Sequence, residues 1–177
     1  MMKTRWNLWA WAGGLAVAAL FYVAPAGAAE HRLGGGVHYW QTVDDLADEG
    51  FDSIDDEGRS LVLSYQYVPA GLVKLQIDAE YFDEGFGGST QEAISPQLYL
   101  LVGGRLYAGV GVGMTYSEDF EDSWSDPFYA ARVGLDLVLL PRTHLDLNAN
   151  YRSNAFSQLD EADTDTVTLG AVLRFRL

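Results

Sequence analysis

The chain has 177 residues, no cysteine, 19 glycines and a formal net charge of -14 at pH 7. Its length suits one domain, and the absence of cysteine excludes disulfide bonds and thiolate metal ligands. Nucleic acid is not expected as a partner, because phosphate binding requires a basic surface.

The amino-terminal segment has the features of a secretory signal: a basic start, an apolar run and then a group of small residues. We predict cleavage after Ala28 or Ala29, so that residues 1–29 form a cleavable helical signal peptide and residues 30–177 form the mature domain. An uncleaved membrane anchor is the alternative, since the apolar run is nearly long enough to span a bilayer.

The mature region alternates apolar and polar side chains, which is the period of β-strands rather than of helices. In the clearest segment, Val73, Leu75 and Ile77 alternate with Lys74 and Gln76. The pattern predicts eight strands. They cover residues 32–42, 58–68, 72–83, 93–102, 105–117, 127–139, 143–153 and 165–177.

The connections between these strands alternate in length. Short turns follow the second, fourth and sixth strands, whereas longer and mostly acidic connections follow the first, third, fifth and seventh. All long connections would then lie at one end, as in outer-membrane barrels. We predict an all-β fold, an eight-stranded antiparallel up-and-down transmembrane β-barrel.

Alternation alone also suits a soluble barrel with an apolar interior, such as a lipocalin. Aromatic residues at the ends of the apolar faces favour the membrane arrangement, because they match the interfacial girdles of membrane barrels. The predicted girdle consists of Tyr39, Tyr67, Tyr81, Tyr116, Tyr129, Tyr151 and Phe175. Glycines between the charges of the polar face also suit a crowded interior better than a solvated surface.

A polar face turned inward would gather charged side chains in a narrow lumen. The predicted ionic network consists of Lys74, Asp78, Glu80, Arg105, Arg132, Asp136, Asp146, Arg152 and Arg174. Its five bases and four acids nearly neutralise each other, which favours a structural ionic core. A narrow ion channel or proton path is the alternative, although eight strands enclose only enough space for side chains.

The last strand keeps its apolar face, including Phe175, up to Leu177. It resembles the carboxy-terminal signature strand of bacterial outer-membrane β-barrels, which usually ends in Phe. This last strand, the number of strands and the asymmetry of loop lengths carry a wider resemblance. In these features the chain resembles the small eight-stranded outer-membrane proteins, which include the OmpX-like proteins and the transmembrane part of OmpA. The resemblance implies an integral outer-membrane location, extracellular long loops, periplasmic termini, insertion by the barrel-assembly machinery, and contact with lipid and lipopolysaccharide.

This fold does not select one function. We expect a porin-like Gram-negative envelope protein with a structural or surface-interaction role, without enzymatic activity, cofactor, catalytic residue or specific metal site. One alternative is a lipid A-modifying enzyme, because residues 151–155 are similar to the His-x-Ser-Asn-Ala motif of barrel lipid A deacylases. Ser153 matches that family's nucleophile and Asp165 or Glu161 its acid. Tyr151, however, replaces the histidine, and tyrosine is a poor general base at neutral pH.

Acidic residues are concentrated between Asp44 and Glu57. Their spacing does not match a calcium-binding EF-hand loop, because Ile54 interrupts the alternating oxygen ligands. The hypothesis is instead a loose association of Mg²⁺ or Ca²⁺ with these loops, where cations would bridge carboxylates and lipopolysaccharide phosphates.

Overall fold

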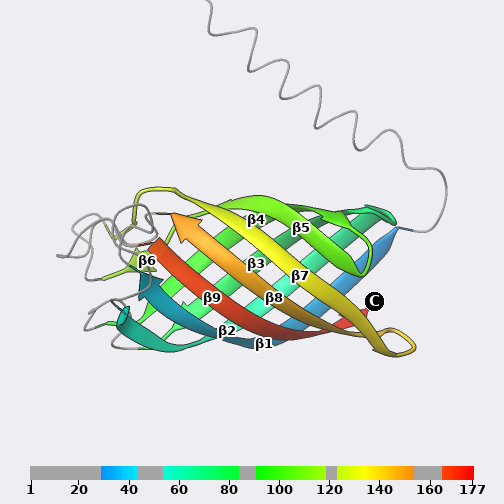
Figure 1. Ribbon diagram of the computed structural model, residues 1–177, viewed down its shortest axis with the longest axis horizontal. Coiled ribbons are helices and arrows are strands. Elements are labelled where there is room, and N and C mark those ends of the chain that lie inside the picture. The colour runs from blue at the N-terminus through cyan, green and yellow to red at the C-terminus, as the bar shows by residue number, and fades with distance from the viewer. Residues whose placement is uncertain (1–28, 44–53, 84–90, 119–122, 154–164) are drawn as a thin grey trace, which may run out of the picture.

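The computed structural model describes residues 29–43, 54–83, 91–118, 123–153 and 165–177. These residues form strands, and no helix among them is long and apolar enough to cross a membrane. The strands are β1 (Glu30–Val43), β2 (Ile54–Ala70), β3 (Val73–Phe82), β4 (Ala93–Gly103), β5 (Leu106–Gly113), β6 (Tyr116–Ser117), β7 (Phe128–Leu140), β8 (Thr143–Ser153) and β9 (Asp165–Arg176). Figure 1 shows that they wrap into one barrel.

Each strand pairs with its neighbours in an antiparallel ladder, in the order β3-β2-β1-β9-β8-β7-β5-β4-β6. Additional pairing of β3 with β4 closes the barrel, and β1 pairs with β9 over their length. The predicted up-and-down topology, with the first strand beside the last, is therefore confirmed.

The short strand β6 continues β5 along the same partner. Gln97 pairs with Gly113 and Ala93 with Ser117, so β5 and β6 share one register on β4. The ladder is interrupted opposite Pro96, which has no backbone N–H, although the Met114 N–H still donates to the Pro96 carbonyl over 3.3 Å. The wall of the barrel therefore has eight strands, as predicted.

Several predicted boundaries differ from the observed ones, and two of these differences change how residues are assigned. Strand β2 begins at Ile54 rather than at residue 58, because β1 and β2 stay paired beyond a bulge between Gln41 and Val43. Part of the predicted acidic loop is therefore strand. Arg105 lies before β5, in the turn after Gly103, and not in the strand.

The two ends of the barrel differ in the connections between their strands. The two-residue turns 71–72, 104–105 and 141–142 lie at one end, here called the short-turn end, together with the carboxyl terminus. Strands β1, β3, β5–β6 and β8 run toward the opposite end, here called the long-loop end. The predicted signal peptide and most of the predicted acidic loop lie outside the described residues.

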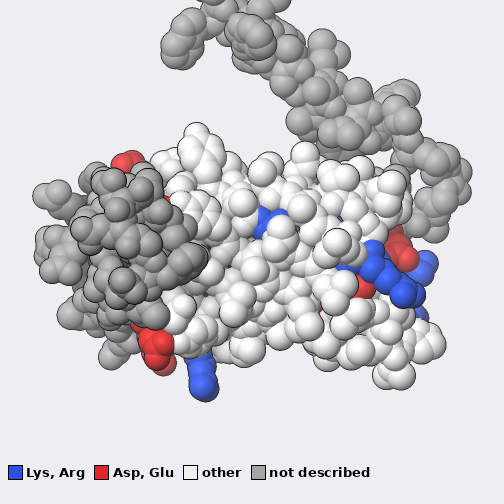
Figure 2. Space-filling model, viewed as in Figure 1, with Lys and Arg blue, Asp and Glu red and all other residues white. Residues whose placement is uncertain are grey.

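Buried and exposed side chains alternate along the strands, which shows which face of the wall points inward. In β3, Lys74, Gln76, Asp78 and Glu80 are buried, whereas Ile77 between them is 54% exposed. The visible wall in Figure 2 is mostly free of charge, and charged side chains gather toward the two ends. The barrel thus has a polar interior and an apolar outer wall, the arrangement that a lipid environment requires.

Inward-facing rings lie over glycines of the neighbouring strand. A Cβ atom on each of these glycines would meet the opposing ring, as for Gly111 beneath Tyr99 and Gly134 beneath Tyr107. Every one of these pairs consists of direct cross-strand partners: Trp40 and Gly58, Tyr99 and Gly111, Phe128 and Gly113, Tyr107 and Gly134, and His38 and Gly170. Glycine therefore makes room for rings that fill the interior.

Candidate functional site

The inward-facing charged side chains form three layers inside the barrel. Nearest the short-turn end, Asp136 accepts from Arg32 Nη1 at 2.7 Å and from Lys74 Nζ at 3.1 Å. The His144 ring nitrogen Nδ1 lies 2.8 Å from the other carboxylate oxygen. The carboxylate thus has three cationic or ring-nitrogen partners, and they come from β1, β3 and β8.

The middle layer contains two ion pairs. Arg132 Nη1 lies 2.7 Å from Asp78 and its guanidinium lies 3.7 Å from the centre of the Tyr99 ring, which is a cation–π contact. Arg174 Nη1 lies 2.9 Å from Asp146, which also accepts from the Tyr107 hydroxyl at 2.7 Å. All four charged side chains are almost completely buried.

The third layer lies toward the long-loop end and is organised around Glu80. Its carboxylate forms an ion pair with Arg152, lies 2.9 Å from His38 Nδ1 and accepts from Gln97 Nε2 at 3.0 Å. The Ser60 hydroxyl also donates to it. Glu80 and Arg152 are both fully buried.

Aromatic side chains cover this third layer. Phe82, Phe128 and Trp40 are buried, with Phe82 and Trp40 in an edge-on contact 6.5 Å between ring centres. The Arg152 guanidinium lies 6.0 Å from the centre of the Phe82 ring and 5.8 Å from that of Phe128. These rings form an apolar plug between the ionic layers and the long-loop end.

The structure places eight of the nine predicted network residues inside the barrel. The exception is Arg105, which is exposed because it lies in the two-residue turn between β4 and β5. Arg32, His38 and His144 belong to the network but were not predicted. Period-two alternation could have found them, because His144 shares one face of β8 with Asp146, and Arg32 and His38 share the polar face of β1.

The predicted girdle residues lie on the outer face. Tyr39, Tyr116, Tyr129, Tyr151 and Phe175 are exposed, and Tyr67 and Tyr81 are half-buried. Some of them have polar or aromatic neighbours there. The Tyr39 hydroxyl donates to Glu57, and the Tyr116 ring lies 5.2 Å from that of Trp124.

Two of the residues that resemble the deacylase motif, Tyr151 and Ser153, lie on the same outer face, whereas residues 154 and 155 lie outside the described part. The Tyr151 hydroxyl donates to Asp165 on the adjacent strand, and the Ser153 hydroxyl donates to the Tyr129 carbonyl at 3.3 Å. His144 is buried in the lumen against Asp136, on the opposite face of β8. The structure therefore brings Tyr151 and Asp165 together but gives the serine no histidine, and Glu161 lies outside the described residues.

Among the described residues, no group of three or more His, Asp or Glu side chains is arranged to hold a metal ion. Residues 44–53, which carry most of the acidic loop considered for Mg²⁺ or Ca²⁺, lie outside the described part.

A closed wall of eight strands, apolar outside and ionic inside, defines an integral membrane β-barrel. No protein-family model matches the sequence, and no curated protein does. Among solved structures, the chain is similar to the crystal structure of Neisserial surface protein A (NspA), with a TM-score of 0.64, 13% identity, and coverage of 85% of this chain and 99% of that one.

Two further likenesses are more distant. They are to the outer membrane protein AlkL, with a TM-score of 0.49, 15% identity and coverage of 86% of this chain and 94% of that one, and to OprG from Pseudomonas aeruginosa, with a TM-score of 0.45, 16% identity and coverage of 84% and 96%. At these identities the likeness concerns the fold. The chain therefore has the fold of a small eight-stranded integral membrane β-barrel with an apolar outer wall.

Proposed function

We propose that this barrel has a structural or surface-interaction role, in which a rigid transmembrane wall presents an acidic long-loop end. The observation that carries the proposal is the filled interior. Each inward-facing acid of the ionic layers is bound to at least one arginine or lysine, and buried aromatic rings cover the layers on one side. Such an interior supports a structural core rather than a site for a substrate.

Acidic side chains at the long-loop end support a surface role. The described and exposed ones are Glu57, Asp83, Glu92, Glu118 and Asp126. With the long loops outside and the termini in the periplasm, as proposed here, these carboxylates would meet the lipopolysaccharide phosphates. Mg²⁺ or Ca²⁺ would then bridge the two sets of anions, because hard cations prefer oxygen ligands.

Titration calorimetry in lipopolysaccharide bilayers tests this role. We expect Ca²⁺ binding to weaken several-fold when Glu57, Glu92 and Glu118 are replaced by glutamine together, and to stay unchanged when the inward-facing Gln76 is replaced by asparagine. Binding that is the same in all three proteins would exclude these carboxylates. Protease digestion of intact cells tests the orientation, since cleavage should occur only in the long loops.

A narrow ion channel is the first alternative. The polar lumen favours it, but Arg132 stacked on Tyr99 and Lys74 over the Tyr107 ring at 4.5 Å obstruct the path. We therefore propose a non-conducting barrel. Planar-bilayer recordings of the purified protein should show no single-channel steps above those of protein-free membranes.

A lipid A-modifying enzyme is the second alternative, favoured only by the hydrogen bond from Tyr151 to Asp165 beside Ser153. Serine needs an adjacent base to act as a nucleophile, and a tyrosine that donates to a carboxylate does not supply one. We propose that the cluster is structural. Mass spectrometry of lipid A should show the same acyl chains in cells that express the natural chain and the Ser153→Ala variant.

A further inference from the structure

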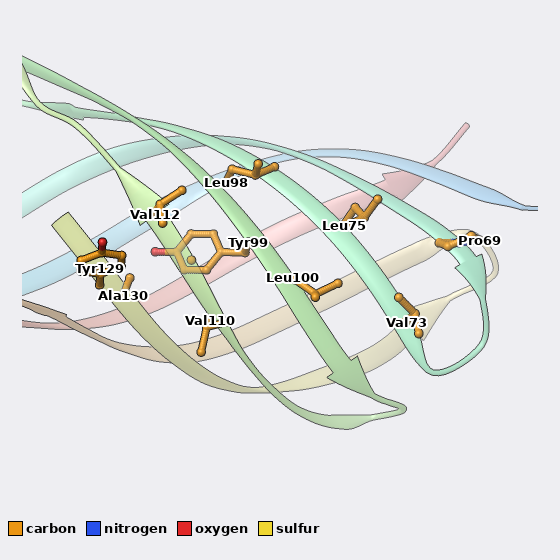
Figure 3. Close-up of a pocket in the computed structure, with 11 residues that line it drawn as sticks. Pro69, Val73, Leu75, Leu98, Tyr99, Leu100, Val110, Val112, Tyr129 and Ala130 are labelled. Carbon is orange, nitrogen blue, oxygen red and sulfur yellow. The ribbon is translucent and has the colours of Figure 1, made fainter. Parts of the chain in front are cut away.

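The outer wall carries an apolar groove over β3, β4, β5 and β7, with a volume of about 740 Å³. Figure 3 shows Val73 beside the β2–β3 turn at one end of the groove and Tyr129 at the other. Leu98, Leu100 and Val110 form part of its lining and are 51%, 38% and 64% exposed. In a membrane, this surface faces lipid chains.

The β4–β5 turn lies beside the Val73 end of the groove, because Val73 pairs with Val102 at the end of β4. Arg105 is exposed in the β4–β5 turn, and that turn is bound to the start of β3: the Gly103 N–H donates to the Leu72 carbonyl at 2.8 Å and Lys74 Nζ to the Gly104 carbonyl at 2.9 Å. No carboxylate of the described residues forms an ion pair with Arg105. The backbone of the turn is thus held in place, and the Arg105 guanidinium is available to bind an anion.

The other exposed arginines at the short-turn end form an ion pair or a hydrogen bond within the protein. Arg176 forms an ion pair with Glu30 at 2.9 Å, and Arg142 Nε donates to the Arg176 carbonyl at 3.2 Å. Both lie at the β8 side of β7, away from the groove. Among the described arginines of the short-turn end, Arg105 therefore combines a guanidinium without an ion pair with a turn at the end of this groove.

We propose that the groove and Arg105 form a binding site for one anionic phospholipid of the leaflet at the short-turn end. One acyl chain lies along the groove and the phosphate lies on the Arg105 guanidinium. The groove alone would not select a lipid, because lipid tails are as apolar as its leucines and valines. Selection therefore comes from the headgroup, since guanidinium binds phosphate through charge-assisted hydrogen bonds. This site is independent of the proposed surface role and of which end faces outward.

A photoactivatable phosphatidylglycerol tests the site. The purified barrel is placed in vesicles of phosphatidylcholine with a small fraction of the probe, and cross-linked residues are mapped by mass spectrometry. We expect cross-links on the groove segment 98–112 to exceed those obtained with a matched phosphatidylcholine probe about fivefold, the effect of one basic residue near an anionic lipid. Arg105→Gln should remove this excess and Arg105→Lys should retain most of it.

Three control variants distinguish binding at this site from a general electrostatic attraction of the anionic probe to the protein. Arg142→Gln at the β7–β8 turn should leave the groove cross-links unchanged, and Val110→Trp should reduce them by filling the groove. Leu169→Trp on the opposite wall should have no effect, and heat-modifiable gel mobility confirms that each variant is folded. Equal yields for the two probes, an unchanged yield in Arg105→Gln, or cross-links from the groove to a second copy of the chain would overturn the proposal.

Discussion

Replacing Arg152 by methionine tests whether paired charges hold the interior together. Arg152 and Glu80 are both fully buried and form an ion pair. Without the guanidinium, Glu80 keeps His38, Ser60 and Gln97 as partners but loses its permanent cation. Breaking a buried pair from one side costs about 3–5 kcal/mol. Because three hydrogen-bonding partners remain on the carboxylate, we expect the unfolding free energy to fall by about 3 kcal/mol, the lower end of this range.

Two matched variants, with smaller expected losses of unfolding free energy, serve as comparisons. Lys74→Met removes one partner of Asp136, which retains Arg32 and His144, so we expect a loss of about 1.5 kcal/mol, the value of one hydrogen bond to a charged group. Arg105→Met removes an exposed arginine from a turn and should change the unfolding free energy by less than about 0.5 kcal/mol. The expected order of destabilisation is therefore Arg152, Lys74 and then Arg105.

Urea unfolding of the barrel in phospholipid vesicles, followed by tryptophan fluorescence, measures these differences. The double variant Glu80→Gln/Arg152→Met should recover most of the loss, because a neutral pair leaves no unpaired buried charge. The reasoning is refuted if Arg152→Met is no more harmful than Arg105→Met, or if the double variant is less stable than the single one.

Three further predictions concern the packing, the wall and the screening of charges. Gly111→Leu places a side chain where the Tyr99 ring lies and should destabilise the barrel by about 2 kcal/mol in the same assay, with partial recovery in Gly111→Leu/Tyr99→Ala. Leu98→Lys puts a charge at the middle of β4 on the lipid face and should cost about 2–4 kcal/mol, whereas Leu98→Ile should be nearly neutral. Unfolding in 1 M NaCl should change the free energy by less than about 0.5 kcal/mol, since salt screens buried pairs little; a large loss would place the ionic layers in contact with solvent.

The strands could be predicted because a barrel wall imposes period-two alternation directly on the sequence. The prediction of strand boundaries failed where the boundary depends on backbone pairing or on a residue of the adjacent strand rather than on the burial of side chains. The start of β2 at Ile54 depends on backbone pairing with β1 beyond the bulge at Gln41, and such pairing needs no apolar side chain. The break between β5 and β6 depends on Pro96, a residue in the adjacent strand, so no pattern within residues 105–117 could indicate it.

The composition of the interior was largely predictable, but its pairing was not. Alternation assigns a side chain to a face, which is why Asp78 and Arg132 could be placed inside. It does not say that they meet, because β3 and β7 are not adjacent and approach only across the closed barrel. Arg105 was misplaced for a related reason: the alternation extends into the two-residue turn, where the chain reverses at the end of the barrel and the side chain is exposed.

The inward rings explain how so many charges are held in a narrow barrel. Each ring lies over a glycine directly across the ladder, which lets Tyr99 and Tyr107 extend over the lumen instead of being pushed apart by a facing side chain. Arg132 and Lys74 then stack on these two rings while they bind their acids. The cations are thus fixed by both a carboxylate and a ring, an arrangement that favours rigidity over transport. What distinguishes this barrel functionally is therefore expected at its lipid-facing wall and its acidic end.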